Sequence, residues 1–130
     1  MLIKLILFVL TLSPLITAQP ASIDTNGYVG CFVNDRSAHE FNAFASHLDE
    51  TQLTPSLCTK ACLAMSYSMA AIEEGTKCFC KSTTSIYYAR DLDSACQVLA
   101  CAGSASLACG SPNNIMVYNS TSSGALKVFI

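Results

Sequence analysis

The stretch that decides the fold is residues 54–81, TPSLCTKACLAMSYSMAAIEEGTKCFCK. It opens on Thr54 and Pro55, which together predict a helix start. Threonine can cap the first free N–H groups, and proline is tolerated at the first helical position. Cys58 and Cys62 follow four residues apart, so they lie on one face of that helix with Cβ atoms about 6 Å apart.

A strand with two cysteines on one face is predicted at residues 77–81, KCFCK. Side chains alternate along a strand, so Cys78 and Cys80 point to the same side, about 6.6 Å apart at a rise of ~3.3 Å per residue. The two lysines and Phe79 point to the other side. Two cysteine pairs with matched spacing can be joined by two disulfides, which would hold the helix flat against the sheet.

Two disulfide patterns satisfy this geometry. They are Cys58–Cys80 with Cys62–Cys78, and Cys58–Cys78 with Cys62–Cys80. We favour the first pattern by analogy with other helix-on-sheet disulfide modules. Each bridge is expected to contribute about 2–4 kcal/mol, so reduction should unfold the domain.

The N-terminus predicts an oxidising compartment for these cysteines. Residues 1–18 hold one lysine, a short apolar run and the small residue Ala18, the pattern of a secretory signal peptide cleaved after that alanine. The apolar run is well short of the ~20 residues that span a bilayer. We therefore expect a secreted protein with no membrane span in the mature chain.

An exported chain with an even number of cysteines is expected to pair them all. The eight are Cys31, Cys58, Cys62, Cys78, Cys80, Cys96, Cys101 and Cys109. We expect the four outside the helix and strand pairs to join one another and to tie the first strand to the C-terminal loop. Zinc is the alternative, but neither His39 nor His47 lies at ligand spacing from a cysteine pair, so we predict no metal site.

Composition limits the remaining function classes. The chain is 52% hydrophobic and 12% charged, and its formal net charge is −2. Removing an 18-residue leader from 130 residues leaves 112, which is room for one domain. Size and pattern exclude a multidomain enzyme and a nucleotide-binding α/β domain. A mildly acidic chain with no basic run lacks the cationic footprint that nucleic acid requires, so we predict no nucleic-acid partner.

Local patterns predict the remaining elements. Runs rich in β-branched and aromatic residues favour strands. The predicted strands are residues 28–33, 67–73, 77–81 and 115–118. Residues 34–54 are predicted as a long loop or a short irregular helix, 82–95 as a second long loop, and 97–109 as coil with a short helical turn. We therefore predict a small disulfide-rich α+β domain, with one main helix packed on a short antiparallel sheet.

The order of the cysteines resembles that of the WSC domain, a family named after fungal cell-wall integrity and stress-response sensors. The resemblance rests on YVGCF at 28–32, LCTKAC at 57–62, KCFC at 77–80, the cysteines at 96, 101 and 109, and VY at 117–118. It covers residues 27–119. It implies a PAN/apple-like fold, an extracellular location with cell-wall association, and binding to carbohydrate such as wall glucans.

The C-terminal tail differs from that of the fungal sensors. Residues 120–130 form a short Ser/Thr-containing tail, whereas the sensors continue into a long stalk, a membrane span and a cytosolic segment. We therefore expect a secreted single module, or a truncated product, rather than a sensor.

Glycan binding needs an exposed aromatic platform and polar side chains that hydrogen-bond to hydroxyl groups. The predicted ligand-binding residues are Tyr87, Tyr88, Asn113, Asn114 and Arg36, with Asn34 and Asp35 beside Arg36. The competing interpretation is that one tyrosine of the pair packs on the core and the other is incidental. The predicted partner is a polysaccharide or a glycoprotein glycan. The alternative is an extracellular protein that contacts loops 34–54 and 82–95.

The carboxylates predict no catalysis. Glu73 and Glu74 are sequence neighbours and would point to opposite faces of a strand, whereas two-carboxylate hydrolysis needs both groups at one bond. Asp91 and Asp93 can share a face, but no general-acid environment is recognisable around them. Nor do they predict a calcium site, because the glycine and the distant glutamate of a calcium loop are missing. The sequence also lacks a nucleophile or phosphate-loop motif. We therefore predict a non-enzyme without a cofactor.

The string Asn119-Ser120-Thr121 is an N-glycosylation sequon. It follows the last predicted strand and precedes a polar tail, so we expect it to be exposed. We therefore predict a glycan on Asn119 in a host that glycosylates.

Overall fold

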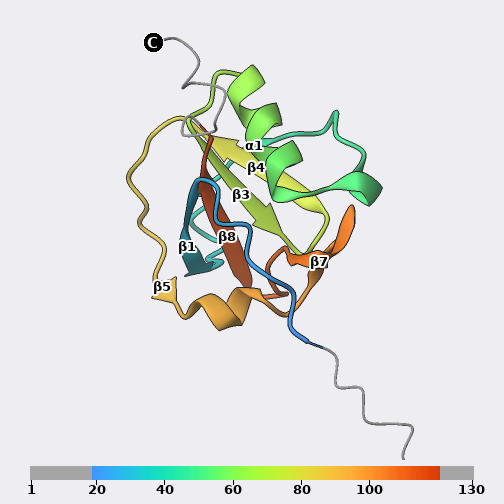
Figure 1. Cartoon of the computed structure of the whole chain (residues 1–130). Helices are drawn as coiled ribbons and strands as arrows, with labels where there is room; N and C mark the ends of the chain where they lie inside the picture. The colour runs from blue at the N-terminus through green and yellow to red at the C-terminus, as the bar shows by residue number, and fades with distance from the viewer. Residues whose placement is uncertain (1–18, 121–130) are drawn as a thin grey trace, which may run out of the picture.

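Six strands within residues 19–120, the part of the chain that the computed structural model describes, form one antiparallel sheet (Figure 1). Its order is β2-β4-β3-β8-β1-β5, where the strands are β1 Tyr28–Val33, β2 Ala43–Phe44, β3 Met69–Glu73, β4 Lys77–Lys81, β5 Arg90–Asp91 and β8 Asn114–Asn119. The other elements of these residues include the helix α1 (Pro55–Ala64) and the short 3-10 helices η2 (Glu50–Gln52) and η3 (Asp93–Cys96). The predicted α+β class is confirmed. The predicted leader, 1–18, and residues 121–130 of the predicted tail lie outside the described residues.

Helix α1 begins as its sequence predicts. Thr54 Oγ1 accepts a hydrogen bond from the Leu57 backbone N–H at 3.2 Å, and Pro55 is the first helical residue. Cys58 and Cys62 are both fully buried against the sheet. Ten residues are too few for a stable isolated helix in water, so α1 depends on this packing.

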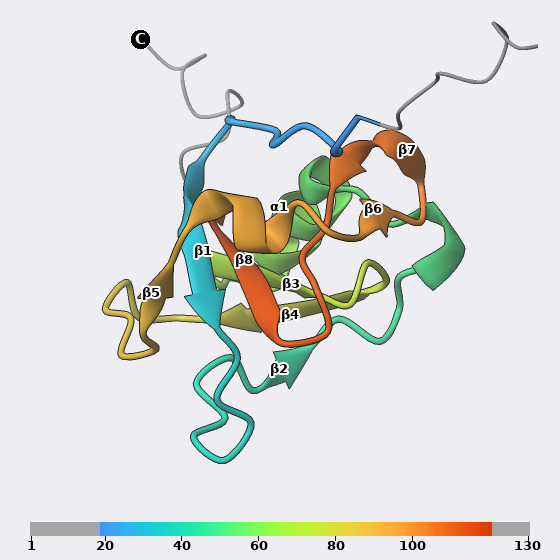
Figure 2. The same ribbon diagram turned by 90° about the horizontal axis from the view of Figure 1, so that it is seen from below.

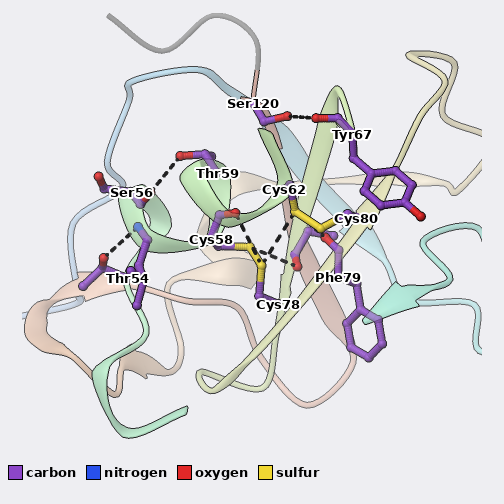
Figure 3. Close-up of a disulfide and its surroundings, with 12 residues drawn as sticks. Thr54, Ser56, Cys58, Thr59, Cys62, Tyr67, Cys78, Phe79, Cys80 and Ser120 are labelled. Carbon is purple, nitrogen blue, oxygen red and sulfur yellow. Dashed lines mark hydrogen bonds between the residues drawn. A yellow bond between two sulfur atoms is a disulfide. The ribbon is translucent and has the colours of Figure 1, made fainter. Parts of the chain in front are cut away.

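Two disulfides hold α1 against β4, as predicted, but in the less favoured of the two predicted patterns (Figure 3). The bridges are Cys58–Cys78 and Cys62–Cys80, each with Cα atoms 5.5 Å apart. The physical reason is strand direction. The chain reverses between α1 and β3 and again between the antiparallel strands β3 and β4, so β4 runs in the same direction as the helix. The first cysteine of the helix therefore meets the first cysteine of the strand.

The other four cysteines pair with one another, as predicted. Cys31 in β1 joins Cys96 in η3, which ties the first strand to the segment that follows the second long loop. The remaining bridge, Cys101–Cys109, is local, with a sequence separation of 8.

This local bridge closes a hairpin of β6 (Ala100–Cys101) and β7 (Ser104–Ala108). The prediction of coil with a helical turn at 97–109 is therefore wrong. The small residues of this segment carry no strand signal of their own, so tertiary contacts decide its conformation. One of these contacts is the hydrogen bond that the Gly103 N–H donates to the Leu53 carbonyl oxygen at 2.8 Å.

The sheet is covered on both faces (Figure 2). One face carries α1 and the two bridges that join it to β4, and its buried side chains include Ala70, Ile72, Met116 and Tyr118. On the other face the buried side chains are Phe32, Phe41, Met69, Ala71, Ile115 and Val117. Ile86 and Tyr88, from the loop after β4, pack on this second layer. We call the two sides the helix face and the loop face.

Candidate functional site

A pocket of about 250 Å³ opens on the loop face of the sheet. Its walls come from the loop after β1, the end of β3, the middle of β4 and the loop before β5. The lining residues are Asn34, Arg36, His39, Phe41, Glu73, Phe79 and Tyr88. The pocket thus combines aromatic rings with groups that can make hydrogen bonds.

The apolar walls are built from three of these rings. Phe41 and Tyr88 form a pair with centroids 6.4 Å apart and planes tilted by 44°. Phe79 reaches this side because alternation along β4 places it opposite to the two cysteines of that strand, and Figure 3 shows its ring directed away from their sulfurs. Phe79 also pairs with Phe44 of the edge strand β2 at 5.0 Å. The aromatic surface therefore continues from the pocket to the sheet edge.

Glu73 is the carboxylate of the pocket. Its Oε1 accepts a hydrogen bond from Asn34 Nδ2 at 3.1 Å, whereas its other carboxylate oxygen accepts none from residues 19–120. Burial raises the pKa of Glu73 above the ordinary 4.5, while the hydrogen bond from Asn34 and the charge of Arg36 oppose that rise. One oxygen is left to accept a hydrogen bond from a ligand.

Arg36 lies at the rim of the pocket. Its Nη2 donates to the Pro112 carbonyl oxygen at 2.9 Å and lies 4.0 Å from the Glu74 carboxylate. The backbone of Asn34 also bonds to this turn, through the carbonyl oxygen of Asn113 at 2.9 Å. The side chain of Asn113 is exposed next to this contact. The structure thus brings Arg36 and Asn113 to the same side of the molecule, as the ligand prediction requires.

The adjacent tyrosines have different surroundings. Tyr87 is 84% exposed, whereas Tyr88 is half-buried and lines the pocket. The Glu40 N–H donates to Tyr88 Oη at 2.9 Å, and burial raises the pKa of this phenol. One tyrosine therefore does pack on the core, as the competing interpretation expects, but it still contributes to the pocket wall.

Asn114 does not join this group. It is 9% exposed, its Nδ2 donates to Asp91 Oδ2 at 2.9 Å, and its Oδ1 accepts from Ser111 Oγ at 3.1 Å. Its amide therefore orders the chain before β8 and lies outside the pocket. Asp35 is exposed and does not line the pocket either, and hydrogen bonds from Ser37 lower the pKa of its carboxyl.

Four of the lining residues are not among the predicted ligand contacts: His39, Phe41, Glu73 and Phe79. The signal for Phe79 is present, because alternation along its strand separates it from the cysteines. Glu73 is weighed only as a catalytic group paired with Glu74. The two carboxylates are separated, as predicted, because Glu74 is exposed in the turn after β3 whereas Glu73 lines the pocket. Phe41 and His39 lie in an irregular loop where no periodicity indicates direction.

The glycosylation sequon lies partly outside the described residues, because it ends at Thr121. Asn119 is the last residue of β8 and is half-buried, so the expected exposure after the strand is wrong. Ser120 is fully buried, and its Oγ donates to the Tyr67 carbonyl oxygen at 2.7 Å. The strand extends further than its apolar pattern predicts.

Three sulfur atoms on the helix face lie within the distance of shared metal ligands. Those of Cys58, Cys62 and Cys78 are within 4.8 Å of one another. Each is already joined in a disulfide, so none offers the thiolate that a metal would require. Their closeness is a consequence of two adjacent bridges.

Comparison with protein families gives a match to the WSC domain over residues 28–111. This segment includes all eight cysteines and every residue that lines the pocket. The chain belongs to the WSC domain family. In this WSC domain the sheet also needs β8, which follows the matched segment and pairs with both β1 and β3.

A curated relative, Kremen protein 2 of Mus musculus, is 27% identical over 92 residues. The aligned part is 71% of this chain and 20% of that relative, so the chain spans about a fifth of the relative's length. The WSC family, the disulfides and this relative are consistent with an extracellular module. Within residues 19–120, no helix combines the length and apolar character needed to cross a membrane.

Proposed function

We propose that this WSC domain binds carbohydrate without catalysis, in the pocket on the loop face. The single observation that carries the proposal is the pairing of aromatic walls with an open carboxylate oxygen in one pocket. Phe41, Phe79 and Tyr88 supply the walls, and Glu73 supplies the oxygen.

Sugars present both kinds of surface that such a pocket can recognise. The C–H groups on one side of a pyranose ring pack on aromatic rings, and the hydroxyl groups around its edge need hydrogen-bond partners. Glu73 accepts such bonds, and Arg36 donates them from the rim. Tyr87, which is 84% exposed, adds a ring surface next to the pocket for a neighbouring sugar unit.

A non-catalytic role is favoured by the arrangement of the carboxylates. Glycoside hydrolysis by the usual mechanism needs two carboxyl groups that flank one bond. The pocket is lined by Glu73 alone among the acidic residues, and Glu74 is exposed beside Arg36 and Lys77, at 4.0 and 3.8 Å. This arrangement supports binding rather than catalysis.

The ligand that we propose is a cell-wall polysaccharide or the glycan of a glycoprotein, met outside the cell. A secreted form, as the leader-like residues 1–18 predict, would place the domain in contact with either. A glycan on Asn119 remains a prediction. Asn119, at the end of β8, pairs with Met69 at the start of β3, whereas the pocket residue Glu73 lies at the other end of β3.

A second candidate function is contact with an extracellular protein. It is favoured by two exposed apolar residues on either side of η3, Leu92 at 74% and Val98 at 63% exposure. Neither residue lines the pocket, so the two functions can be separated by mutation.

The test is binding of the oxidised protein to insoluble β-glucan, chitin and mannan. We expect retention on at least one polymer, and about a tenfold loss of affinity for Tyr87→Ala, since loss of one stacked ring corresponds to about 1.4 kcal/mol. Leu92→Ala is the matched control, because it also truncates an exposed apolar side chain. Retention on none of the polymers by the wild-type protein would contradict the proposal, and protein capture that depends on Leu92 would support the second candidate.

A further inference from the structure

A buried ion pair lies on the loop face, next to the pocket. It joins Glu40, from the loop after β1, to Lys81, the last residue of β4, and the side chain of each is 7% exposed. Neither residue lines the pocket. Their position between the two loops that carry the pocket rings is what makes the pair of interest.

The Glu40 carboxylate orders the second of these loops. Besides the Lys81 ammonium, its Oε2 accepts a hydrogen bond from the Tyr87 backbone N–H at 2.8 Å. Its Oε1 accepts from the Tyr88 N–H at 3.0 Å. The backbone N–H of Glu40 in turn donates to Tyr88 Oη. One residue of the first loop therefore holds both the backbone and the phenol of the second.

The Lys81 ammonium completes the arrangement. It donates to the Ser85 carbonyl oxygen, in the same second loop. It also lies 5.3 Å from the centroid of the Phe41 ring and 5.7 Å from that of Tyr87, distances at which a cation and a ring attract each other. The ammonium thus occupies one side of the Tyr87 ring, and a ligand would take the other.

Stability is a poor explanation for a pair of this kind. Removing two charges from water is so unfavourable that apolar residues of similar volume often stabilise a core as well or better. Ligand affinity, by contrast, gains directly from such order, because side chains and loops that are already held do not have to be ordered when the ligand binds.

We propose that Glu40 and Lys81 are the positioning residues of the pocket, which fix Tyr87 and Tyr88 in their binding orientation before the ligand arrives. The part that concerns a ligand rests on the proposed function. The part that concerns the order of the loop does not, and can be measured without any ligand.

The experiment compares two double variants of the full oxidised chain. Glu40→Gln with Lys81→Met removes both buried charges at nearly constant volume. Because the amide nitrogen of glutamine is itself a donor, one of the Tyr87 and Tyr88 N–H groups loses its acceptor. Glu50→Gln with Lys60→Met makes the same substitutions at two exposed positions away from the pocket. For each variant, hydrogen exchange gives the protection of single backbone amides, urea unfolding gives stability, and titration with soluble β-glucan, chitin and mannan oligosaccharides gives affinity.

We expect exchange at the Tyr87 and Tyr88 amides to become at least about tenfold faster in the first variant. The amides of β3, which lies inside the sheet between β4 and β8, should keep their protection. Affinity for the oligosaccharide that the wild type binds should fall about tenfold, even where urea unfolding shows a folded protein of similar stability. The control variant should match the wild type within about twofold in all three measurements.

Unchanged exchange at these two amides, or affinity equal to that of the control, would overturn the inference and leave the proposed function standing. Failure of the wild type to bind any oligosaccharide overturns the proposed function instead. In that case the exchange measurement still decides whether the pair orders the loop.

Discussion

The helix face and the loop face of one sheet are held by different kinds of bond. On the helix face, two disulfides join α1 to β4, and the chain around them is regular and buried. On the loop face, irregular segments are held by ring contacts and by the Glu40–Lys81 pair, and a pocket stays open between them. Covalent links secure the helix face, and the candidate site lies on the face that non-covalent contacts hold.

Strand β4 takes part in both faces. Cys78 and Cys80 point to the helix, whereas Phe79 and Lys81 point to the loops. The bridges therefore fix the strand that carries one pocket wall and one partner of the buried pair. Loss of the two bridges should therefore disturb both faces, whereas changes on the helix face that leave the bridges intact should not reach the pocket.

The largest effect is expected from removal of both bridges of the helix face. Replacement of Cys58, Cys62, Cys78 and Cys80 by alanine should lower the free energy of unfolding by about 2–4 kcal/mol per bridge, which approaches the ~5–15 kcal/mol total of an ordinary domain. Urea unfolding followed by circular dichroism measures the loss. The comparison variant replaces Cys101 and Cys109, a single bridge that closes a shorter loop. Equal midpoints for the two variants would contradict a special role of the helix face.

The next largest effect is expected from Lys81→Met alone. It leaves the Glu40 carboxylate buried without its partner, which typically lowers stability by about 3–5 kcal/mol. The double variant with Glu40→Gln should recover a large part of that loss, a coupling that a double-mutant cycle measures. The exposed substitution Lys60→Met serves as the control. Additive losses in the cycle would show that the two charges act independently.

A smaller effect is expected at the start of α1. Thr54→Ala removes the hydrogen bond to the Leu57 N–H and should lower the free energy of unfolding by about 1 kcal/mol. Thr54→Ser keeps the capping oxygen and should stay close to the wild type. Because the cap lies on the helix face, oligosaccharide affinity should not change. An affinity loss as large as that of Tyr87→Ala would sink the separation of the two faces.

The smallest effect is expected from Glu73→Gln, and it depends on pH. Burial raises the pKa of Glu73 in the folded protein, so the unfolded chain loses its proton at lower pH. The stability linked to this group is complete at acidic pH, below the ordinary 4.5, and is lost as pH rises through the folded pKa. Relative to the wild type, Glu73→Gln should therefore raise the melting temperature more at pH 7 than at pH 3.5. The difference between the two pH values should be equivalent to less than about 0.5 kcal/mol.

The comparison for this last prediction is Glu50→Gln, the same substitution at an exposed glutamate. Differential scanning calorimetry at both pH values measures the difference. A stabilisation by Glu73→Gln that is larger at pH 3.5 than at pH 7 has the wrong sign and would refute the assignment of burial as the cause.

Much of the helix face could be predicted from the sequence, because its signals are local. Thr54 and Pro55 predict the helix start, and the spacing of Cys58 and Cys62 places them on one side. The order of the bridges could not be taken from spacing, since either pattern fits two matched pairs. It depends on the direction of β4 relative to α1, which the fold sets.

The candidate site was predicted only in part. Tyr88, Arg36 and Asn34 do line the pocket, but Asn114 lies inside the protein. Phe41 could not be found, because its loop has no periodicity to indicate which way a ring points. Contacts across long sequence separations, such as the 48 residues between Glu40 and Tyr88, leave no local pattern.

The sequence by itself determined the covalent character of this protein: eight cysteines, two of them on one helix face and two on one strand face, in a family that the spacing of those cysteines identifies. Tertiary structure alone decided which cysteine meets which, that residues 100–108 form a hairpin, and that two distant loops enclose a pocket. The physical reason is range. Helix and strand periodicity acts over a few residues, whereas a pocket depends on the path by which the chain returns to itself.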